Sequence, residues 1–178
     1  MKQALLVIDI QNDYFRGGPM ELSGAEAAAD RAADVIKKFR ERKLPVIFIK
    51  HIASRPEAGF FLPDTPGAEI NHRVKPLESE KVIIKHFPNS FIETELKTHL
   101  ESIKITDLTI VGMMTHMCID ATTRAAKDLG YNTTVVGDAC ATRDLVIDGA
   151  PVKSEEIQKS FLAALNYFYS TVKTSDMI

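Results

Sequence analysis

Residues 4–9 read Ala4-Leu5-Leu6-Val7-Ile8-Asp9, five apolar residues followed at once by a carboxylate. A short run that is apolar on both faces is typical of a strand in a parallel sheet, because helices cover both faces of such a sheet. Similar short apolar runs recur along the chain, and amphipathic stretches separate them. This alternation predicts a βαβ protein.

The positions of the strands and helices follow from the same alternation. Strands are expected at residues 4–8, 46–49, 82–84, 108–111 and 133–136, with an edge strand at 170–174. Helices are expected from residue 23 or 24 to about 39, and at about 92–101, 117–129 and 155–168, with Gly130 capping the third. We therefore predict an α/β fold: a doubly wound, three-layer α/β/α, Rossmann-like arrangement with a parallel sheet of about six strands. One domain is expected to span residues 1–178.

One long stretch lacks this periodicity. Residues 52–79 are rich in proline and glycine and show neither helical nor strand spacing. Loops of this length in a compact domain are usually functional. We expect this segment to be a lid or a binding loop.

Composition limits the classes of partner. The formal net charge is -2, and the basic residues are scattered rather than clustered, which gives no reason to expect nucleic acid or an anionic membrane as partner. No apolar run approaches the roughly 20 residues of a membrane span, and no signal peptide is visible. With two cysteines, Cys118 and Cys140, no disulfide framework is suggested. We expect a cytoplasmic protein.

Three reactive side chains stand where the predicted strands end. Asp9 follows the first strand, Lys85 ends the third, and Cys118 lies six residues beyond Gly112, which ends the fourth. In an open parallel sheet, ligands bind just beyond the carboxyl ends of the strands. A nucleophile, a base and a cation are therefore expected at one edge of the sheet.

Cys118 is expected in the first turn of a helix that Thr115 caps. Free N–H groups and the positive end of the helix dipole lower the pKa of a thiol there, and the thiolate is the nucleophilic form. The same N–H groups could form an oxyanion hole. The alternative is a small buried helix residue, which is the usual role of a free cysteine.

Asp9 and Lys85 each allow two interpretations. A partly desolvated carboxylate at a strand end can act as a base toward a thiol, or it can cap a turn. A lysine at a strand end can keep such a carboxylate ionised and favour the thiolate, or it can lie at the rim with its ammonium in water. Only the combination with Cys118 favours catalysis.

Four segments then match a known pattern in order and spacing over nearly the whole chain. They are Leu6–Phe15 (D-x-Q-x-D-F), Lys85 with Phe91–Leu96 (K…F-x-x-T-x-L), Gly112–Ile119 (G-x-x-T-x-x-C-V) and Asp138–Ala141 (D-A-x-A). The sequence thereby resembles the isochorismatase-like cysteine hydrolases, which include nicotinamidases, N-carbamoylsarcosine amidohydrolases and isochorismatases.

The resemblance implies a catalytic triad of Asp9, Lys85 and Cys118. It also implies a cis peptide bond between Met113 and Met114, and an oxyanion hole made by the backbone N–H groups of Met114 and Cys118. In the implied reaction Asp9 takes the thiol proton, the thiolate attacks a carbonyl, ammonia or an amine leaves, and water releases the acid from a thioester. A small-molecule substrate and a homo-oligomer, dimer or tetramer, are likewise implied.

The resemblance implies that Phe15 lines the substrate pocket. Further substrate contacts are expected from His51, Phe87 and Phe91, within a pocket built by the loop at 52–79 and by residues near 87–91 and 143–152. Phe15 could instead be ordinary core, and His51 could be a hydrogen-bonded histidine at the rim.

A metal is not expected. Nicotinamidases place a metal-binding Asp-x-His after the second strand, and residues 50–54 hold His51 but no carboxylate. His51 and His72 without a third ligand would make a poor metal site. We therefore expect no metal and no cofactor, and nicotinamidase activity is disfavoured.

The predicted function is metal-independent hydrolysis of an amide or ureido C–N bond in a small molecule. One alternative is vinyl-ether hydrolysis of the isochorismatase kind, although the thiol argues against it. The other is a non-catalytic α/β domain that binds a small ligand. No G-x-G-x-x-G or phosphate loop is present, which disfavours dinucleotide binding.

Overall fold

The computed structural model describes residues 2–178. Its centre is a six-stranded sheet in the order β3-β2-β1-β4-β5-β8, in which every neighbouring pair is parallel. The strands are β1 (Gln3–Ile8), β2 (Val46–His51), β3 (Lys81–Lys85), β4 (Asp107–Met113), β5 (Asn132–Ala141) and β8 (Thr171–Lys173). The strand order reverses between β1 and β4, which is the switch point where ligands bind in doubly wound folds.

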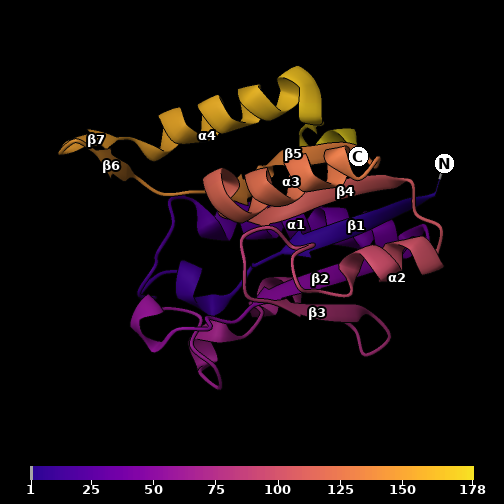
Figure 1. Cartoon of the computed structure of the whole chain (residues 1–178), viewed down its shortest axis with the longest axis horizontal. Helices are drawn as coiled ribbons and strands as arrows, with labels where there is room; N and C mark the ends of the chain where they lie inside the picture. Colours follow the sequence, from indigo (N-terminus) through magenta and orange to yellow (C-terminus); the bar gives the residue numbers. More distant parts are fainter. Residues whose placement is uncertain (1) are drawn as a thin grey trace.

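Helices cover both faces of the sheet (Figure 1). Helix α1 (Ala25–Glu41) packs on one face in a core cluster that includes Leu5 and Val7 of β1. Helices α2 (Leu96–Ser102) and α3 (Asp120–Asp128) pack on the other face, and Leu165, just after α4 (Ser154–Ala164), joins them there. The predicted three-layer α/β/α fold with six parallel strands is confirmed.

The residues of β1 show why the central strand is apolar throughout. Leu5 and Val7 belong to the cluster under α1, whereas Ala4, Leu6 and Ile8 belong to the cluster under α2 and α3. All five are at most 1% exposed, and burying one Leu, Ile or Val side chain contributes about 1.5–3 kcal/mol. A polar residue at any of these positions would lie in one of the two cores.

The helix boundaries differ from the prediction in two places. Helix α2 begins at Leu96 rather than near residue 92, because Glu93 adopts a left-handed φ of 54°, which a right-handed helix cannot accommodate. Helix α3 begins at Asp120, and a π turn (Thr115–Ile119) precedes it. The C-terminal cap was predicted correctly: Gly130 has a φ of 92°, and the N–H of Tyr131 donates to the Ala126 carbonyl, as in a Schellman motif.

A short hairpin was not predicted. Strands β6 (Leu145–Ile147) and β7 (Ala150–Val152) pair antiparallel around Asp148-Gly149, both with positive φ. Asp-Gly between two short runs is a hairpin signal, but Pro151 obscured it because proline weakens a strand pattern.

The hairpin and the long loop lie at the same end of the molecule. Strand β1 runs away from the N-terminus, and both the β6–β7 hairpin and the loop after β2 lie beyond the far ends of the strands (Figure 1). That loop is shaped by three short 3₁₀ turns, Pro56–Ala58, Pro66–Ala68 and His72–Val74. No helix within residues 2–178 is both long enough and apolar enough to cross a membrane.

Gly112 provides a test of how closely β1 and β4 approach. Its φ is 132°, and a Cβ built there would lie 1.9 Å from the Ile8 carbonyl oxygen. We predict that Gly112→Ala lowers the free energy of unfolding by more than about 3 kcal/mol, through clash and backbone strain together. Urea unfolding followed by circular dichroism measures this.

Gly130→Ala is the matched control. Gly130 also has a positive φ, but a Cβ there would meet nothing within 4 Å, so only backbone strain of about 1 kcal/mol is expected. If both variants lost the same free energy of unfolding, the clash with the Ile8 carbonyl oxygen would contribute nothing beyond backbone strain.

Candidate active site

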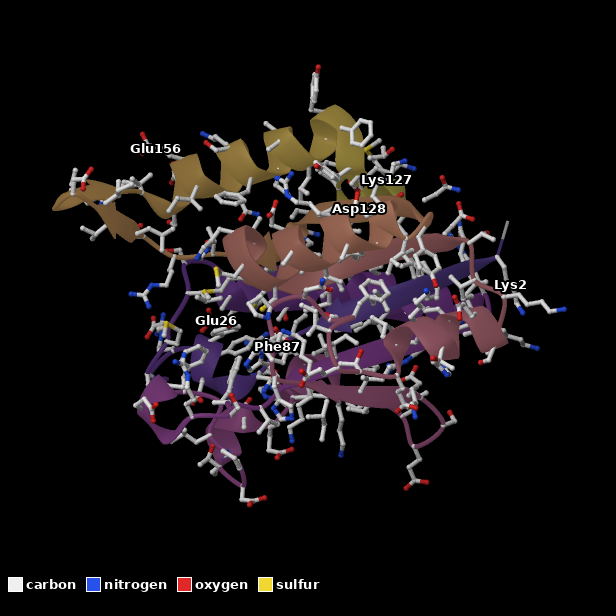
Figure 2. All side chains as sticks on the ribbon, viewed as in Figure 1. Lys2, Glu26, Phe87, Lys127, Asp128 and Glu156 are labelled. Atoms are coloured by element: carbon white, nitrogen blue, oxygen red, sulfur yellow. The ribbon has the colours of Figure 1, made fainter. Side chains whose placement is uncertain are left out.

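The carboxyl ends of four neighbouring strands bring the predicted residues together. Asp9 follows β1, His51 ends β2, Lys85 ends β3, and the chain after β4 leads to Cys118. His51 and Lys85 are register partners across β2 and β3. In Figure 2, Phe87, just beyond β3, lies away from Lys2, which marks the opposite, amino-terminal edge of the sheet.

Asp9 and Lys85 form a buried ion pair. The Lys85 ammonium lies 2.7 Å from the Asp9 carboxylate, and both side chains are 0% exposed. Asp9 adopts a left-handed φ of 52°, within a tight turn in which the Gln11 N–H donates to the Asp9 carbonyl. Apart from the ion pair, neither carboxylate oxygen has a hydrogen-bond partner among residues 2–178, so the carboxylate keeps acceptor capacity for a proton.

The Lys85 ammonium also contacts the nucleophile. Nζ lies 3.2 Å from Cys118 Sγ and donates to the carbonyl of Phe87 at 3.0 Å, with that of Pro88 at 3.4 Å. Burial alone would lower the pKa of Lys85, but the negative charge of Asp9 and the Cys118 sulfur raise it above its usual value. The site therefore holds a permanent cation.

The surroundings of Cys118 raise the pKa of its thiol, contrary to the prediction. Cys118 lies in the π turn and is 5% exposed. Burial raises the pKa of its thiol, Asp9 raises it further, and Lys85 opposes them only in part. The sequence led us to expect a lowered pKa at a helix start. A thiolate formed by losing its proton to water would add a net negative charge to a closed site whose charges already balance.

Proton transfer within the site avoids that cost. A carboxylate oxygen of Asp9 and the Cys118 sulfur lie within 4.8 Å of each other. If the thiol proton moves to Asp9, the thiolate faces the Lys85 ammonium and the total charge of the site does not change. At neutral pH the native arrangement therefore favours a nucleophile whose proton passes to the neighbouring carboxylate.

The start of the Cys118 turn differs in detail from the expectation. Met114, not Thr115, is the N-cap residue, and the Thr115 hydroxyl donates to the Ala141 carbonyl at 3.2 Å. The peptide bond between Met113 and Met114 is cis. The N–H groups of Met117 and Ile119 both donate to the Met114 carbonyl, so they are already used within the turn. The oxyanion role of the Met114 and Cys118 N–H groups stays a prediction.

His51 is fixed in one tautomer beside the triad. Its Nδ1 lies 3.1 Å from Lys85 Nζ, and because an ammonium has no acceptor, Nδ1 must accept and the ring proton must lie on Nε2. Burial and the Lys85 charge lower the pKa of His51 to about 4. His51 is therefore a neutral side chain with a single N–H to offer.

Asp9, His51 and Cys118 also form a possible set of metal ligands, with donor atoms that all lie within 4.8 Å of one another. The Lys85 ammonium already contacts each of them, at 2.7, 3.1 and 3.2 Å, and it occupies the space that a cation would need. His72 is exposed to solvent and belongs to a separate turn after Asn71. These residues are therefore poorly suited to hold a metal.

The three aromatic residues predicted to contact substrate lie in different surroundings. Phe15 is 7% exposed and packs in the core cluster under α1. Phe87 is 39% exposed, and its carbonyl holds Lys85. Phe91 stacks on Tyr131, the residue before β5, with ring centroids 6.1 Å apart. Phe91 also packs against the core cluster that contains Cys118, and the substrate roles of Phe15, Phe87 and Phe91 stay predictions.

Two residues near the triad, Gln11 and Tyr14, were given no separate role from the sequence, whereas Phe61 belongs to an apolar loop segment, residues 60–63, for which covering the pocket was one interpretation. Gln11 is 0% exposed and binds both backbone groups of His51, at 2.7 and 2.8 Å. Tyr14 is buried beside the site, and the pKa of its hydroxyl is raised by burial and then by the nearby Cys118 and Asp9 side chains. Phe61 packs against Tyr14 with the two rings tilted by 58° and their centroids 4.6 Å apart. The sequence signal that could have identified Gln11 and Tyr14 was the concentration of polar and aromatic residues at 11–15, directly after the first strand.

Comparison with known proteins gives a consistent result. Residues 3–175 match the family model of the Isochorismatase domain. The chain is 49% identical over 176 residues to the uncharacterized isochorismatase family protein YddQ of Bacillus subtilis, covering 99% of this chain and 98% of that protein.

Solved structures agree. A structure from Oleispira antarctica, assigned to the isochorismatase hydrolases, superposes with a TM-score of 0.95 at 47% identity and covers 99% of this chain and 95% of its own. The N-carbamoylsarcosine amidase from Thermoplasma acidophilum superposes with a TM-score of 0.84 at 26% identity and covers 100% of this chain and 99% of its own.

A double-mutant cycle tests the buried ion pair. Lys85→Met leaves the Asp9 carboxylate buried without its cation, and we expect a loss of about 3–5 kcal/mol in the free energy of unfolding. Adding Asp9→Asn removes the unpaired charge, so the double variant should be more stable than Lys85→Met alone. Urea unfolding of the three variants measures this, and a double variant as unstable as the sum of the singles would contradict pairing.

Alkylation tests the state of the thiol. Because the pKa of Cys118 is raised, reaction with iodoacetamide should be slow at pH 7 and keep rising past pH 9, beyond the usual thiol pKa of about 8.5. Asp9→Asn removes the negative charge beside the sulfur and leaves the Lys85 ammonium without its anion, so the resting thiolate is favoured and the alkylation rate at pH 7 should rise by at least about tenfold. The label reports resting ionisation, whereas turnover also needs Asp9 as the acceptor of the thiol proton.

Mass spectrometry locates the label, and Cys118→Ala controls for Cys140, whose pKa burial raises to about 12. A plateau below pH 8 in the native protein would show that the thiolate already exists at rest.

Proposed function

Because the chain belongs to the isochorismatase family of hydrolases, we propose that it is a metal-independent cysteine hydrolase that cleaves the C–N bond of a small amide or ureido compound through a thioester. One observation carries the proposal: a single buried ammonium, that of Lys85, contacts both the Asp9 carboxylate at 2.7 Å and Cys118 Sγ at 3.2 Å. A nucleophile, a base and an electrostatic stabiliser thus form one connected unit.

The first step forms the carbon–sulfur bond. The Cys118 sulfur attacks the substrate carbonyl carbon while its proton passes to Asp9, and the carbonyl electron pair moves to oxygen. The Lys85 ammonium stabilises the sulfur as it loses its proton, because the two lie 3.2 Å apart. We assign the N–H groups of Met114 and Cys118 as donors to the developing oxyanion.

The remaining steps restore the enzyme. The tetrahedral intermediate collapses, the C–N bond breaks, and the proton on Asp9 passes to the leaving nitrogen, which departs as ammonia or an amine. Water then attacks the thioester while Asp9 takes one of its protons. Breaking the carbon–sulfur bond releases the acid, and that proton returns to the thiol.

His51 suits the role of an orienting donor in this scheme. Its Nδ1 accepts from Lys85, so its N–H lies on Nε2, and a neutral donor can bind a substrate carbonyl or carboxylate oxygen. A protein of the same fold is an N-carbamoylsarcosine amidase, which supports cleavage of a C–N bond. The presence of a thiol nucleophile disfavours the vinyl-ether reaction.

We also propose that the protein acts in the cytoplasm as a homo-oligomer, dimer or tetramer. Both cysteines are free, which suits a reducing compartment. Val146, Ile147 and Phe168 are each at least 65% exposed, and exposed apolar residues of this kind are frequent at subunit contacts.

A substrate screen tests the function. A panel of small primary amides and N-carbamoyl amines is incubated with the protein, and released ammonia is measured. We expect turnover of at least one compound, a loss of about 10³-fold or more in kcat for Cys118→Ala and for Asp9→Asn, and an acyl-enzyme mass adduct on Cys118 that hydroxylamine removes.

Isochorismate is included as the contrasting substrate. If Cys118→Ala keeps full activity on isochorismate and no amide is turned over, the C–N proposal is wrong and the vinyl-ether reaction takes its place. If the native protein acts on no compound of either class and forms no adduct, a binding function is favoured.

A further inference from the structure

Asp13 is a buried carboxylate outside the triad, and the long loop is built around it. Its side chain accepts the backbone N–H of Phe61 at 2.6 Å, and the residue is 9% exposed. A Cβ at Gly67 would lie 1.8 Å from Asp13 Oδ1, so the loop backbone closes on the carboxylate from a second side. The carboxylate thus lies between the loop backbone at Phe61 and that at Gly67, and its hydrogen bond holds the Phe61 N–H.

Phe61 is held in a conformation that a bulky residue rarely adopts. Its φ is 53°, in the left-handed region that is costly for such side chains. Three contacts hold it: its N–H donates to Asp13, its carbonyl accepts from the N–H of Ala53 at 2.8 Å, and its ring is 0% exposed. The charge-assisted bond to Asp13 is the strongest of these by type.

The ring of Phe61 connects this anchor to the active site. It lies 4.6 Å from the Tyr14 ring and 5.9 Å from the His51 ring, measured between centroids. His51 also contacts the triad, because its Nδ1 lies 3.1 Å from Lys85 Nζ. His51 is therefore held between an aromatic ring and the catalytic ammonium, while Gln11 fixes its backbone.

We propose that Asp13 is a positioning residue: by holding Phe61, it keeps the His51 ring packed against Lys85, so that His51 presents one fixed N–H donor to the substrate. The loop at 52–79 then acts as a fastened wall of the site rather than as a lid. The inference rests on the proposed function only where it calls Lys85 catalytic and gives His51 a substrate.

Other bonds fasten the same loop and separate this role from general anchoring. Asn12 donates to the Pro66 carbonyl at 2.8 Å and accepts from Asn71, and Gln11 donates to the Ala68 carbonyl. These bonds hold residues 66–71 and do not touch Phe61. Loss of Asp13 should therefore free Phe61 while leaving the later part of the loop in place.

The test follows the pKa of His51 by NMR titration of the imidazole signals, which needs no substrate. His51→Gln identifies the His51 signal among the five histidines. Lys85, Asp9 and His86 are the titratable groups that act on His51, and each is retained in every test variant. The pKa of His51 should be about 4 in the native protein.

Asp13→Ala should raise the pKa of His51 toward the ordinary value of about 6.5, because a ring freed from Phe61 gains solvent and moves away from the Lys85 cation. Asp13→Asn keeps an oxygen acceptor for the Phe61 N–H and should restore most of the native value. Phe61→Leu keeps the backbone bond but removes the aromatic ring, and should raise the pKa as Asp13→Ala does. Asn12→Ala is the matched control and should leave it near 4.

If the pKa of His51 stays near 4 in both Asp13→Ala and Phe61→Leu, the proposal is overturned. A rise in Asn12→Ala as large as in Asp13→Ala would also overturn it, since general loosening of the loop would then suffice. Should Asp13→Ala fail to fold, Asp13→Asn and Phe61→Leu decide the matter. A failed amide screen leaves these results unaffected, so the two proposals can fail separately.

Discussion

The buried ion pair between Lys85 and Asp9 is the interaction on which the rest of the site depends. Removing two charges from water costs several kcal/mol for each ion, and only close pairing offsets that cost. Here the partners come from β3 and β1, with β2 between them, and they meet at 2.7 Å with both side chains 0% exposed. The ends of these strands must therefore be set accurately, and the turn that holds Asp9 at a left-handed φ contributes to this.

The same pair sets the chemistry of the thiol. A site that is already neutral and closed resists a further charge, so the pKa of Cys118 is raised rather than lowered. Proton transfer from sulfur to Asp9 leaves the total charge unchanged, and the thiolate then faces the Lys85 ammonium, 3.2 Å away in the resting site. Reactivity in such a site comes from moving a proton between neighbours. Substrate entry and proton transfer are then coupled, because the thiolate forms as it attacks.

Around this centre, the polar residues after β1 join the parts of the site. Gln11, Asn12 and Asp13 bind the backbone of β2 and of the long loop at 52–79. A segment with few regular hydrogen bonds of its own thereby gains a defined position. Tyr14 and Phe61 pack together between that loop and the triad. The Phe61 ring lies beside the His51 ring, and His51 in turn contacts the Lys85 ammonium.

The alternation of apolar and amphipathic runs was sufficient to predict the six parallel strands, the three layers and the strand ends where Asp9, Lys85 and Cys118 stand, because local period and strand direction decide those features. The hairpin around Asp148-Gly149 carried a local signal that Pro151 obscured. Only the tertiary structure decided the direction of the Cys118 pKa shift, the stacking of Phe91 on Tyr131, and the link from Asp13 to Phe61. Each of these depends on which side chains, dozens of residues apart in the chain, are packed together out of water, and no local pattern in the sequence contains that information.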